Sequence, residues 1–428
     1  MTIFLLFVLM FALVAINVPI AIALSVIGVV AILFTQGPDQ LANVALVMFD
    51  GTTNFPLLAI PLFILAGAIM NTSGISRRLI AFASALIGFV RGGLAMVNVA
   101  TSMFFAEISG SAVADVAALG SILIPAMKRK GYPAPFAAAI TSSSATLAVI
   151  IPPSIPMILY AVMAESSVVK LFVAGVVPGI LGGLMMMVLA YWFARRFDYP
   201  VEETFHLPRL WITFKDAAWA FMMPVIILGG IFGGLVTATE GAGLAVATAL
   251  FIGGVIYREL TWTHLREAMV EGSVQTAVVM LLVAASALVG TYLTEAQVPQ
   301  RLAAAIIGLT DNKWAVLGLM NVFFLIAGLF LHSAAAIILI VPIVMPVVYA
   351  VGIDPVHFGI IVTLNLGIGQ QTPPVASVLV TACSVAKADI WEVSKINVYF
   401  IGVLFVVLML VTYLPFTALS LVDLFYGG

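Results

Sequence analysis

The sequence contains few charged residues, a single cysteine and no phosphate-binding loop. Only 8% of its 428 residues are Asp, Glu, Lys or Arg, and the net charge of −2 excludes a basic nucleic-acid-binding surface. Cys383 cannot form an intrachain disulfide and is interpreted as a small apolar packing residue. The pattern GxxxxGK followed by Ser or Thr is absent, so this chain does not hydrolyse a nucleotide through a P-loop.

Apolar residues are abundant instead, at 63% of the chain with a mean hydropathy of +1.23, which is typical of a membrane protein. The opening MTIFLLFVLMF lacks the basic segment of a cleaved signal peptide and is interpreted as part of a retained first helix. Stretches of roughly 18 apolar residues or more predict helices that cross the bilayer. Nine crossings are predicted, at residues 3–34, 53–72, 134–164, 171–193, 219–238, 241–257, 274–293, 356–386 and 396–421. Two further apolar regions, 94–127 and 315–349, are predicted to be re-entrant hairpins made of two half-depth segments each.

The basic residues sort to one side of this arrangement. Lys170, Arg301 and Lys313 fall on one side, and the other fourteen of the 17 Lys and Arg fall on the opposite side. Because basic residues are enriched in cytoplasmic loops, the N-terminus is predicted to be cytoplasmic and the C-terminus periplasmic.

The chain matches itself at a constant offset of 221 residues. Four helix-breaking residues match: Pro125 with Pro346, Gly131 with Gly352, Pro152 with Pro373, and Pro153 with Pro374. The basic loop 128–130 corresponds to the uncharged residues 349–351, and opposite loop charge indicates an inverted repeat. The expected units are scaffold helices at 1–60, a first repeat at 61–193, a cytoplasmic amphipathic linker at 194–220, central scaffold helices at 221–273, a second repeat at 274–400 and a last helix at 401–428.

Four segments should interrupt helices within the membrane. They are the turns SGSA (109–112) and LHSAA (331–335) and the double-proline segments IIPPSIP (150–156) and GQQTPPVAS (369–377). Unwound backbone persists in a bilayer only where protein or water surrounds it, so these breaks mark the candidate site. Their carbonyls and hydroxyls would suit a small alkali cation, and half-helix N-termini would suit an anionic group. One cation site per repeat is predicted, formed by Ser109, Ala148, Ile151 and Ser154 in the first and by Gly328, Gly369, Thr372 and Val375 in the second.

An anionic substrate is predicted to lie between the tips, near Ser111, Ser144, His332, Ser333 and Asn365. Several of these residues also have structural interpretations. Hydroxyls in membrane helices often bond only to neighbouring backbone, which is favoured for each of Ser142, Ser143 and Ser144. Glu107 and Asp115 could take part in ion coupling or could cap backbone amides. His332 could be a proton switch or a hydrogen-bonding residue at the tip.

With these motifs, the sequence resembles the large membrane subunit of tripartite ATP-independent periplasmic (TRAP) transporters, the DctM-like family. The resemblance covers essentially the whole chain. Its most specific parts are ISGSAVADVAALGSILIPAMKRKGY (108–132), IIPPSIPMILY (150–160) and GIDPVHFGIIVTLNLGIGQQTPP (352–374). The second tip, LHSAA, and the segment VASVLVT after the second double proline depart from the family pattern, so a relative's substrate is not transferred.

The resemblance implies an all-α polytopic elevator transporter, in which a transport domain of hairpins and broken helices slides against a scaffold. It further implies Na⁺ coupling, a small four-helix DctQ-like membrane subunit, a periplasmic substrate-binding protein, a small carboxylate substrate and a place in the bacterial inner membrane. Two rival functions stay open. One is a stand-alone H⁺- or Na⁺-coupled carboxylate carrier, favoured if Glu107 or Asp115 is essential. The other is an intramembrane hydrolase, disfavoured because no convincing histidine or lysine base lies near the clustered serines.

Overall fold

A computed structural model describes residues 8, 9, 12, 13, 16, 18–109, 111–201, 204–310 and 312–427, with the side chains of residues 36 and 107–109 outside the description. Its elements are helices, joined by loops and one isolated antiparallel bridge between Arg91 and Val201. Within the described residues, eight helices are long and apolar enough to cross a membrane. The prediction of an all-α polytopic protein is therefore confirmed.

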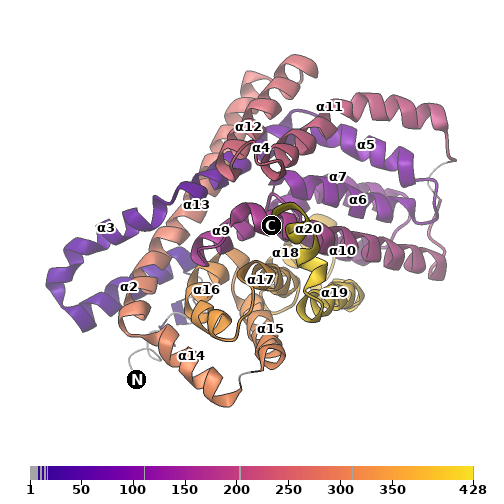
Figure 1. Cartoon of the computed structure of the whole chain (residues 1–428). Coiled ribbons are helices and arrows are strands. Elements are labelled where there is room, and N and C mark those ends of the chain that lie inside the picture. Colours follow the sequence, from indigo (N-terminus) through magenta and orange to yellow (C-terminus); the bar gives the residue numbers. More distant parts are fainter. Residues whose placement is uncertain are drawn as a thin grey trace.

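The chain divides into two series of helices, drawn from indigo to yellow in Figure 1. The first series comprises α2 (Ile20–Gln36), η1 (Pro38–Gln40), α3 (Leu41–Thr52), η2 (Phe55–Leu58), α4 (Ala59–Thr72), α5 (Ile75–Ile87), α6 (Gly93–Ser109), α7 (Ala112–Arg129), α8 (Ala134–Ala145), η3 (Thr146–Val149), α9 (Ile155–Met163) and α10 (Val168–Arg196). The second comprises α11 (Leu207–Phe232), α12 (Ala238–Phe251), η4 (Ile252–Ile256), α13 (Trp262–Glu295), α14 (Val298–Leu309), α15 (Lys313–Phe330), α16 (Ser333–Ala350), α17 (Pro355–Gly369), α18 (Ser377–Ala386), α19 (Ile390–Tyr413) and α20 (Phe416–Tyr426).

Each predicted hairpin region contains two successive helices joined by a short tip, α6 and α7 in the first and α15 and α16 in the second. Helix α6 packs on α7, whereas α15 and α16 make few contacts with each other. Each arm has 17 or 18 residues, or roughly 27 Å at about 1.5 Å per residue. The predicted bounds, 94–127 and 315–349, agree with the structure to within two residues at each end. The depth to which the hairpins enter the bilayer stays a prediction.

Both predicted broken helices are also present. Helix α8 tightens into η3, leaves helical geometry at the Pro152–Pro153 step and resumes as α9. Helix α17 ends before the Pro373–Pro374 step and the chain resumes as α18. The peptide bond between the two prolines is cis in each segment. The breaks fall where the prolines remove backbone donors, as the sequence predicts.

The helix bounds follow the 221-residue offset. Helices α7 and α16 correspond at both ends, and α6 with α15, α8 with α17, α9 with α18 and α10 with α19 start within one residue of correspondence. Contacts between the repeats follow the same correspondence. Helix α7 packs on α18 of the other repeat, and the equivalent helix α16 packs on α9, the equivalent of α18. The sequence match therefore reports a structural repeat rather than coincident prolines.

Several helices differ from the predicted spans, among them α13, which begins at Trp262, and α14, which matches no predicted span. Helix α2 begins after Pro19, so residues 3–34 are not one described helix, and the start of that span lies outside the described residues. Helix α3 was not predicted, because Asn43, Asp50 and Gly51 interrupt its apolar pattern. Helix α11 starts at Leu207, so the amphipathic stretch is continuous with the following span. The predicted span 396–421 is divided into α19 and α20 at Pro415.

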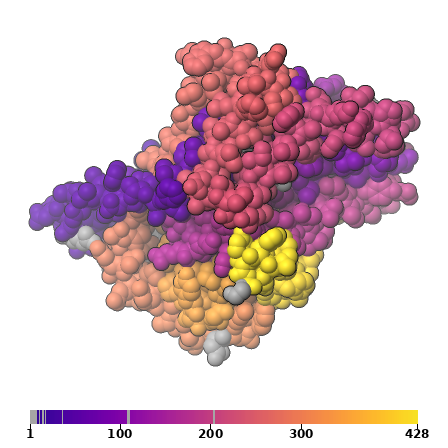
Figure 2. All heavy atoms as spheres, turned by 45° about the horizontal axis from the view of Figure 1, so that its top comes forward, coloured from indigo at the N-terminus to yellow at the C-terminus, as the bar shows by residue number. Residues whose placement is uncertain are grey.

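Helices α2 and α3 lie along the long helix α13 and extend away from the rest of the molecule (Figure 1). The space-filling view shows this arm as a projection (Figure 2). Helix α3 has no buried residue, and Leu46 and Phe49 are exposed on it. The apolar surface of the arm is therefore suited to lipid or to another membrane protein.

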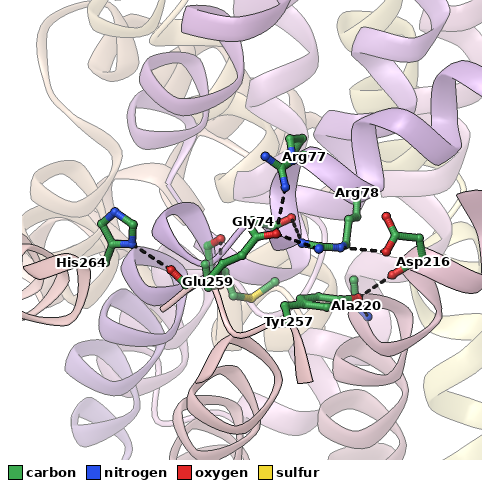
Figure 3. A network of polar contacts seen from close by, with 10 residues as sticks. Gly74, Arg77, Arg78, Asp216, Ala220, Tyr257, Glu259 and His264 are labelled. Atoms are coloured by element: carbon green, nitrogen blue, oxygen red, sulfur yellow. Dashed lines mark hydrogen bonds and ion pairs between the residues drawn. The ribbon is translucent and has the colours of Figure 1, made fainter. Parts of the chain in front are cut away.

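A polar network joins α5 to α11 and to the loop before α13 (Figure 3). The Arg78 guanidinium contacts Glu259 at 2.8 Å and Asp216 at 3.1 Å, and it lies 3.8 Å from the centre of the Tyr257 ring. Arg77 contacts the same Glu259 oxygen at 2.9 Å. Burial alone would lower the pKa of Arg78, but the hydrogen bonds that it donates to Glu259 and Asp216 outweigh this effect and raise that pKa. The network fixes three helices outside the region of the breaks.

Candidate functional site

The two broken helices lie at the centre of the protein. Residues 146–154, which form the first break and its approach, are all buried. Every residue of α17 from Val356 to Gly369 is buried as well. Their surroundings are other helices, so the unwound backbone satisfies the condition for non-helical structure at membrane depth.

At the first break, the chain is held by its own backbone and by Ser154. The amides of Ile150 and Ile151 both donate to the Leu147 carbonyl, at 3.0 and 2.8 Å. The Ser154 hydroxyl donates to the Val149 carbonyl at 2.8 Å and caps α9 by accepting from the Met157 amide. Ala148, Ile151 and Ser154 are thus brought together by local geometry. The side chain of Ser109 lies outside the described part of the chain.

At the second break, two helices meet backbone to backbone. A Cβ added to Gly369 at the end of α17 would lie 2.5 Å from the Gly328 backbone of α15. The Thr372 amide donates to the Gly369 carbonyl at 2.9 Å, and its hydroxyl donates to the Ile368 carbonyl at 3.0 Å. The structure brings Gly328, Gly369 and Thr372 together, and Val375 follows on the same loop, 48% exposed. Only glycine permits this close approach.

The predicted substrate residues at the tips cap helices. Ser111 is the N-cap of α7 and accepts from the Ala114 amide. His332, at the equivalent position, caps α16 by accepting from the Ala334 amide at 3.4 Å. Ser333 is buried at the first position of that helix. These contacts orient the hairpin tips, and substrate binding by these residues stays a prediction.

Ser144 and Asn365 occupy equivalent positions and tie each broken helix to a hairpin arm. The Ser144 hydroxyl lies 2.9 Å from that of Ser102 on α6. The Asn365 amide nitrogen donates to Asn321 Oδ1 on α15 at 2.7 Å, and to the Ile361 carbonyl. Asn321 in turn donates to Thr412 on α19 at 3.0 Å. The structure places Ser144 and Asn365 in separate clusters, and within the described side chains neither hydrogen-bonds to a tip residue.

A buried network that the sequence did not single out connects the two repeats. The Ser143 hydroxyl on α8 lies 2.7 Å from Gln371 Oε1 and 2.6 Å from Asn397 Oδ1. The Gln371 amide nitrogen donates to Thr146 at 2.6 Å. Gln371 belongs to the second break and Asn397 to α19, so four polar side chains cross the interface between repeats. The sequence feature that could have pointed to this network is the presence of two adjacent glutamines and an asparagine within apolar stretches.

Among the described residues of this region, several buried oxygens have no hydrogen-bond partner. They are Thr101 Oγ1 on α6, Ser142 Oγ on α8 and Asn365 Oδ1 on α17. The orientation of the Asn365 amide is set by its nitrogen, which donates to two acceptors. Within the described residues, no group of three His, Cys, Asp or Glu side chains could hold a metal ion. A cation here would therefore be bound by neutral oxygens.

Asp115 and Glu107 are the two carboxylates predicted from the sequence either to take part in ion coupling or to cap backbone amides. Asp115 is buried in the first turn of α7, where the N-terminal end of the helix dipole stabilises a negative charge. The side chain of Glu107 lies outside the described residues. The position of Asp115 favours the capping interpretation over ion coupling.

Comparison with known proteins identifies the family. The family model described as "Tripartite ATP-independent periplasmic transporter, DctM component" matches residues 7–417. The C4-dicarboxylate TRAP transporter large permease protein DctM of Pseudomonas aeruginosa is 40% identical over 90% of both chains. The isethionate TRAP transporter permease protein DctMQ of Oleidesulfovibrio alaskensis is 41% identical over 96% of this chain, which spans only 64% of that relative. The sialic acid permease SiaM of Vibrio cholerae is 38% identical over 89% of both.

A solved structure shares the fold. The Alcanivorax borkumensis YdaH transporter matches with a TM-score of 0.64 over 92% of this chain and 90% of that one, at 16% sequence identity. At this identity, the likeness concerns the fold alone. The repeated, broken-helix architecture, the family match over nearly the full length and the identity to several large permeases agree, and the chain belongs to the DctM component family of TRAP transporters.

Proposed function

We propose that this chain is the substrate-translocating subunit of a Na⁺-coupled, binding-protein-dependent importer of a small carboxylate. The observation that supports it most is the pair of interrupted helices, related by 221 residues and buried at the centre of the protein. Interrupted helices at such a depth supply carbonyls and helix ends that can bind ions and charged substrates. The protein would lie in the bacterial inner membrane, with a cytoplasmic N-terminus and a periplasmic C-terminus.

Sodium would bind to neutral oxygens near each break. In the first repeat, Ser109, Ala148, Ile151 and Ser154 would form the site, and in the second Gly328, Gly369, Thr372 and Val375. The residues fit such an ion, because the helix before each break carries a buried oxygen without a hydrogen-bond partner, Asn365 Oδ1 on α17 and Ser142 Oγ on α8. A hard monovalent cation is an appropriate partner for oxygens of this kind. Na⁺ neutralises the charge of an anionic substrate, and its binding would link the substrate to the ion gradient.

An elevator movement is supported by the way the helices group. Both hairpins and both broken helices contact one another across the repeats, through α7 with α18 and α16 with α9. A second group, α4, α11 and α12, packs together, with α13 along α2, α3 and α4. The first group would move as the transport domain, and the second would stay fixed as the scaffold. The Arg78 network lies in the second group and would keep α5 attached to it.

The partners would be a small DctQ-like membrane subunit and a periplasmic substrate-binding protein. The DctMQ relative supports the first, because its name combines DctM with DctQ and this chain spans 64% of its length. The exposed apolar arm of α2, α3 and α13 offers a surface for a membrane subunit. The substrate would be a small organic acid, since relatives are named for C4-dicarboxylate, sialic acid and isethionate.

The test is transport by the purified chain in proteoliposomes, with and without the small subunit and the binding protein. Uptake of substrate captured by the binding protein should follow an inwardly directed Na⁺ gradient and stop when Na⁺ is replaced by K⁺ or choline. Uptake that persists unchanged without Na⁺ contradicts the coupling. Uptake that needs neither partner but follows a proton gradient, and is lost in Asp115→Asn, would establish the stand-alone carrier instead.

A further inference from the structure

A basic cavity lies at one end of α10, away from both helix breaks. Its volume is about 600 Å³, and Val90, Arg91, Tyr191 and Arg195 line it. Val90 and Arg91 come from the turn between α5 and α6, and the other two residues come from the end of α10. No step of the proposed transport uses this cavity.

The arginines of the cavity are positioned by neighbours that leave part of each guanidinium available. Arg195 Nε donates to the Tyr191 hydroxyl at 2.9 Å, and the described residues give Arg195 no acidic partner. Arg91 pairs through one terminal nitrogen with Asp198 at 2.5 Å, and its side chain remains 46% exposed. Guanidinium groups present five donors in a fixed plane, so nitrogens not used in these contacts can bind another oxyanion.

The length of α10 indicates where the cavity lies relative to the membrane. This helix is apolar enough to cross a membrane, and its 29 residues extend about 43 Å, which exceeds the roughly 30 Å hydrocarbon layer. Arg195 therefore lies at a bilayer surface, in the last turn of the helix. Trp192 is 50% exposed and Phe197 is 57% exposed beside it, and such aromatic side chains are enriched at the headgroup level.

The turn that carries Arg91 is packed closely against α10. Gly92 has a φ of +74°, and a Cβ added there would lie 2.2 Å from the Ala194 Cβ. The Gly92 amide donates to the Pro200 carbonyl at 3.2 Å. The two arginines are thus held at a fixed separation by the backbone rather than by their own contacts.

We propose that Arg91, Arg195 and the Tyr191 hydroxyl bind the phosphate group of an anionic phospholipid or a soluble phosphate of the same charge. Bidentate guanidinium–phosphate contacts would occupy the free nitrogens, and the acyl chains of a lipid would lie against the exposed aromatics. Binding would hold the end of α10 to the turn where hairpin α6–α7 begins. The proposal depends on the membrane placement of α10 and not on the transported substrate.

The full-length chain in detergent can test the proposal by thermal unfolding with added phosphatidylglycerol, phosphatidylcholine or inorganic phosphate. The double variant R91Q/R195Q is compared with R129Q/R266Q, which removes the same charge from two exposed arginines outside the cavity. We expect phosphatidylglycerol to raise the midpoint of the wild-type and the control by several degrees more than phosphatidylcholine does. The cavity variant should lose most of that difference.

A comparison of phosphatidylglycerol with inorganic phosphate distinguishes a bound lipid from a bound soluble anion. Stabilisation by phosphatidylglycerol but not by inorganic phosphate identifies a lipid, and equal stabilisation by both identifies a soluble anion, provided that R91Q/R195Q abolishes it in each case. Native mass spectrometry should then show fewer retained phospholipids, or phosphate adducts, on the cavity variant than on the control. The proposal is overturned if every additive shifts the unfolding midpoint of the cavity variant and the control equally. It is also overturned if no additive shifts the midpoint of the wild-type protein.

Discussion

The two double-proline breaks have the same backbone plan but different surroundings. Ser154, in the first break, is completely buried, whereas its equivalent in the second, Val375, is 48% exposed. The polar network at the second break, Gln371 with Ser143, Thr146 and Asn397, corresponds by the 221-residue offset to Ile150, Leu364, Gly367 and Val176. The equivalent positions in the other repeat are therefore occupied by apolar side chains or glycine.

This difference shows that internal symmetry sets where helices break but not what surrounds each break. One segment is sealed by neighbouring helices and the other is partly accessible. Alternating access requires two such states to exchange, so the enclosed and the open break are what the proposed mechanism expects of one end state. The following predictions examine that asymmetry, from the largest effect to the smallest.

The largest effect is expected from filling the close contacts at the breaks. Gly369→Ala places a Cβ 2.5 Å from Gly328 backbone, and Gly175→Ala places one 2.2 Å from the Ile150 carbonyl. We expect each to destabilise the protein by about 1–3 kcal/mol, because backbone must move in a packed interior, and to reduce uptake severely. Thermal unfolding and proteoliposome uptake measure both. Gly402→Ala, with nothing within 4 Å, is the control. Wild-type behaviour of Gly369→Ala would show that the second break is not tightly packed.

The next prediction concerns accessibility. In a Cys383→Ala background, a cysteine at Val375 should react with a soluble maleimide at least ~10-fold faster than one at Ser154, because only the first is exposed in the native state. Labelling after denaturation should be equal and controls for intrinsic reactivity. Equal rates in the native protein would mean that the two breaks are equally open.

The polar network at the second break should contribute measurably to stability. Gln371→Leu leaves Ser143 and Thr146 without their buried amide partner, at a cost of about 1–3 kcal/mol in the free energy of unfolding. The neighbouring Gln370→Leu is a matched control, because Gln370 Nε2 is buried without a hydrogen-bond partner. Chemical denaturation compares the two variants. A smaller loss of stability for Gln371→Leu than for Gln370→Leu would show that the network does not contribute to the difference between the two breaks.

The smallest effect is expected far from either break. Glu259→Gln weakens the contacts with Arg77 and Arg78, and partial exposure of these groups limits the cost to about 1 kcal/mol or less. The pKa of Arg78 is raised in the folded protein, so its contribution is present below that pKa and throughout the physiological range. Thermal unfolding against Glu267→Gln, an exposed acidic residue nearby, measures the loss. A Na⁺ dependence altered by Glu259→Gln would contradict the assignment of this network to the scaffold.

Much of the fold could be predicted from the sequence. Paired prolines in apolar stretches located both breaks, because their missing amide hydrogens force the same local outcome in any surroundings. The offset of 221 residues, seen at Pro125, Gly131 and the double prolines, anticipated the helix correspondence. Hydropathy was less informative where helices serve as arms or interfaces. Helix α3 was missed, because polar residues and glycine interrupt its apolar pattern.

The candidate site was less predictable because it depends on contacts between segments far apart in the chain. Gly328 and Gly369 were named from their positions beside breaks, and the structure brings their backbones together. The network of Ser143, Gln371 and Asn397 depends on three helices meeting, which no local pattern reports. Ser111 and His332 were named as binding residues, yet their contacts within the chain are helix caps, a role that serine commonly has at such turns.

The uninterrupted register between the halves has a practical use. Because α7 and α16 correspond residue for residue, each half of the chain can be built with the backbone conformation of the other. Under the proposed mechanism, exchanging the two conformations would describe the opposite end state, in which the break at residues 150–154 is exposed and that at residues 371–375 is buried. The structure of one end state thus predicts the structure of the other. Pairs of cross-linkable cysteines can test that prediction directly.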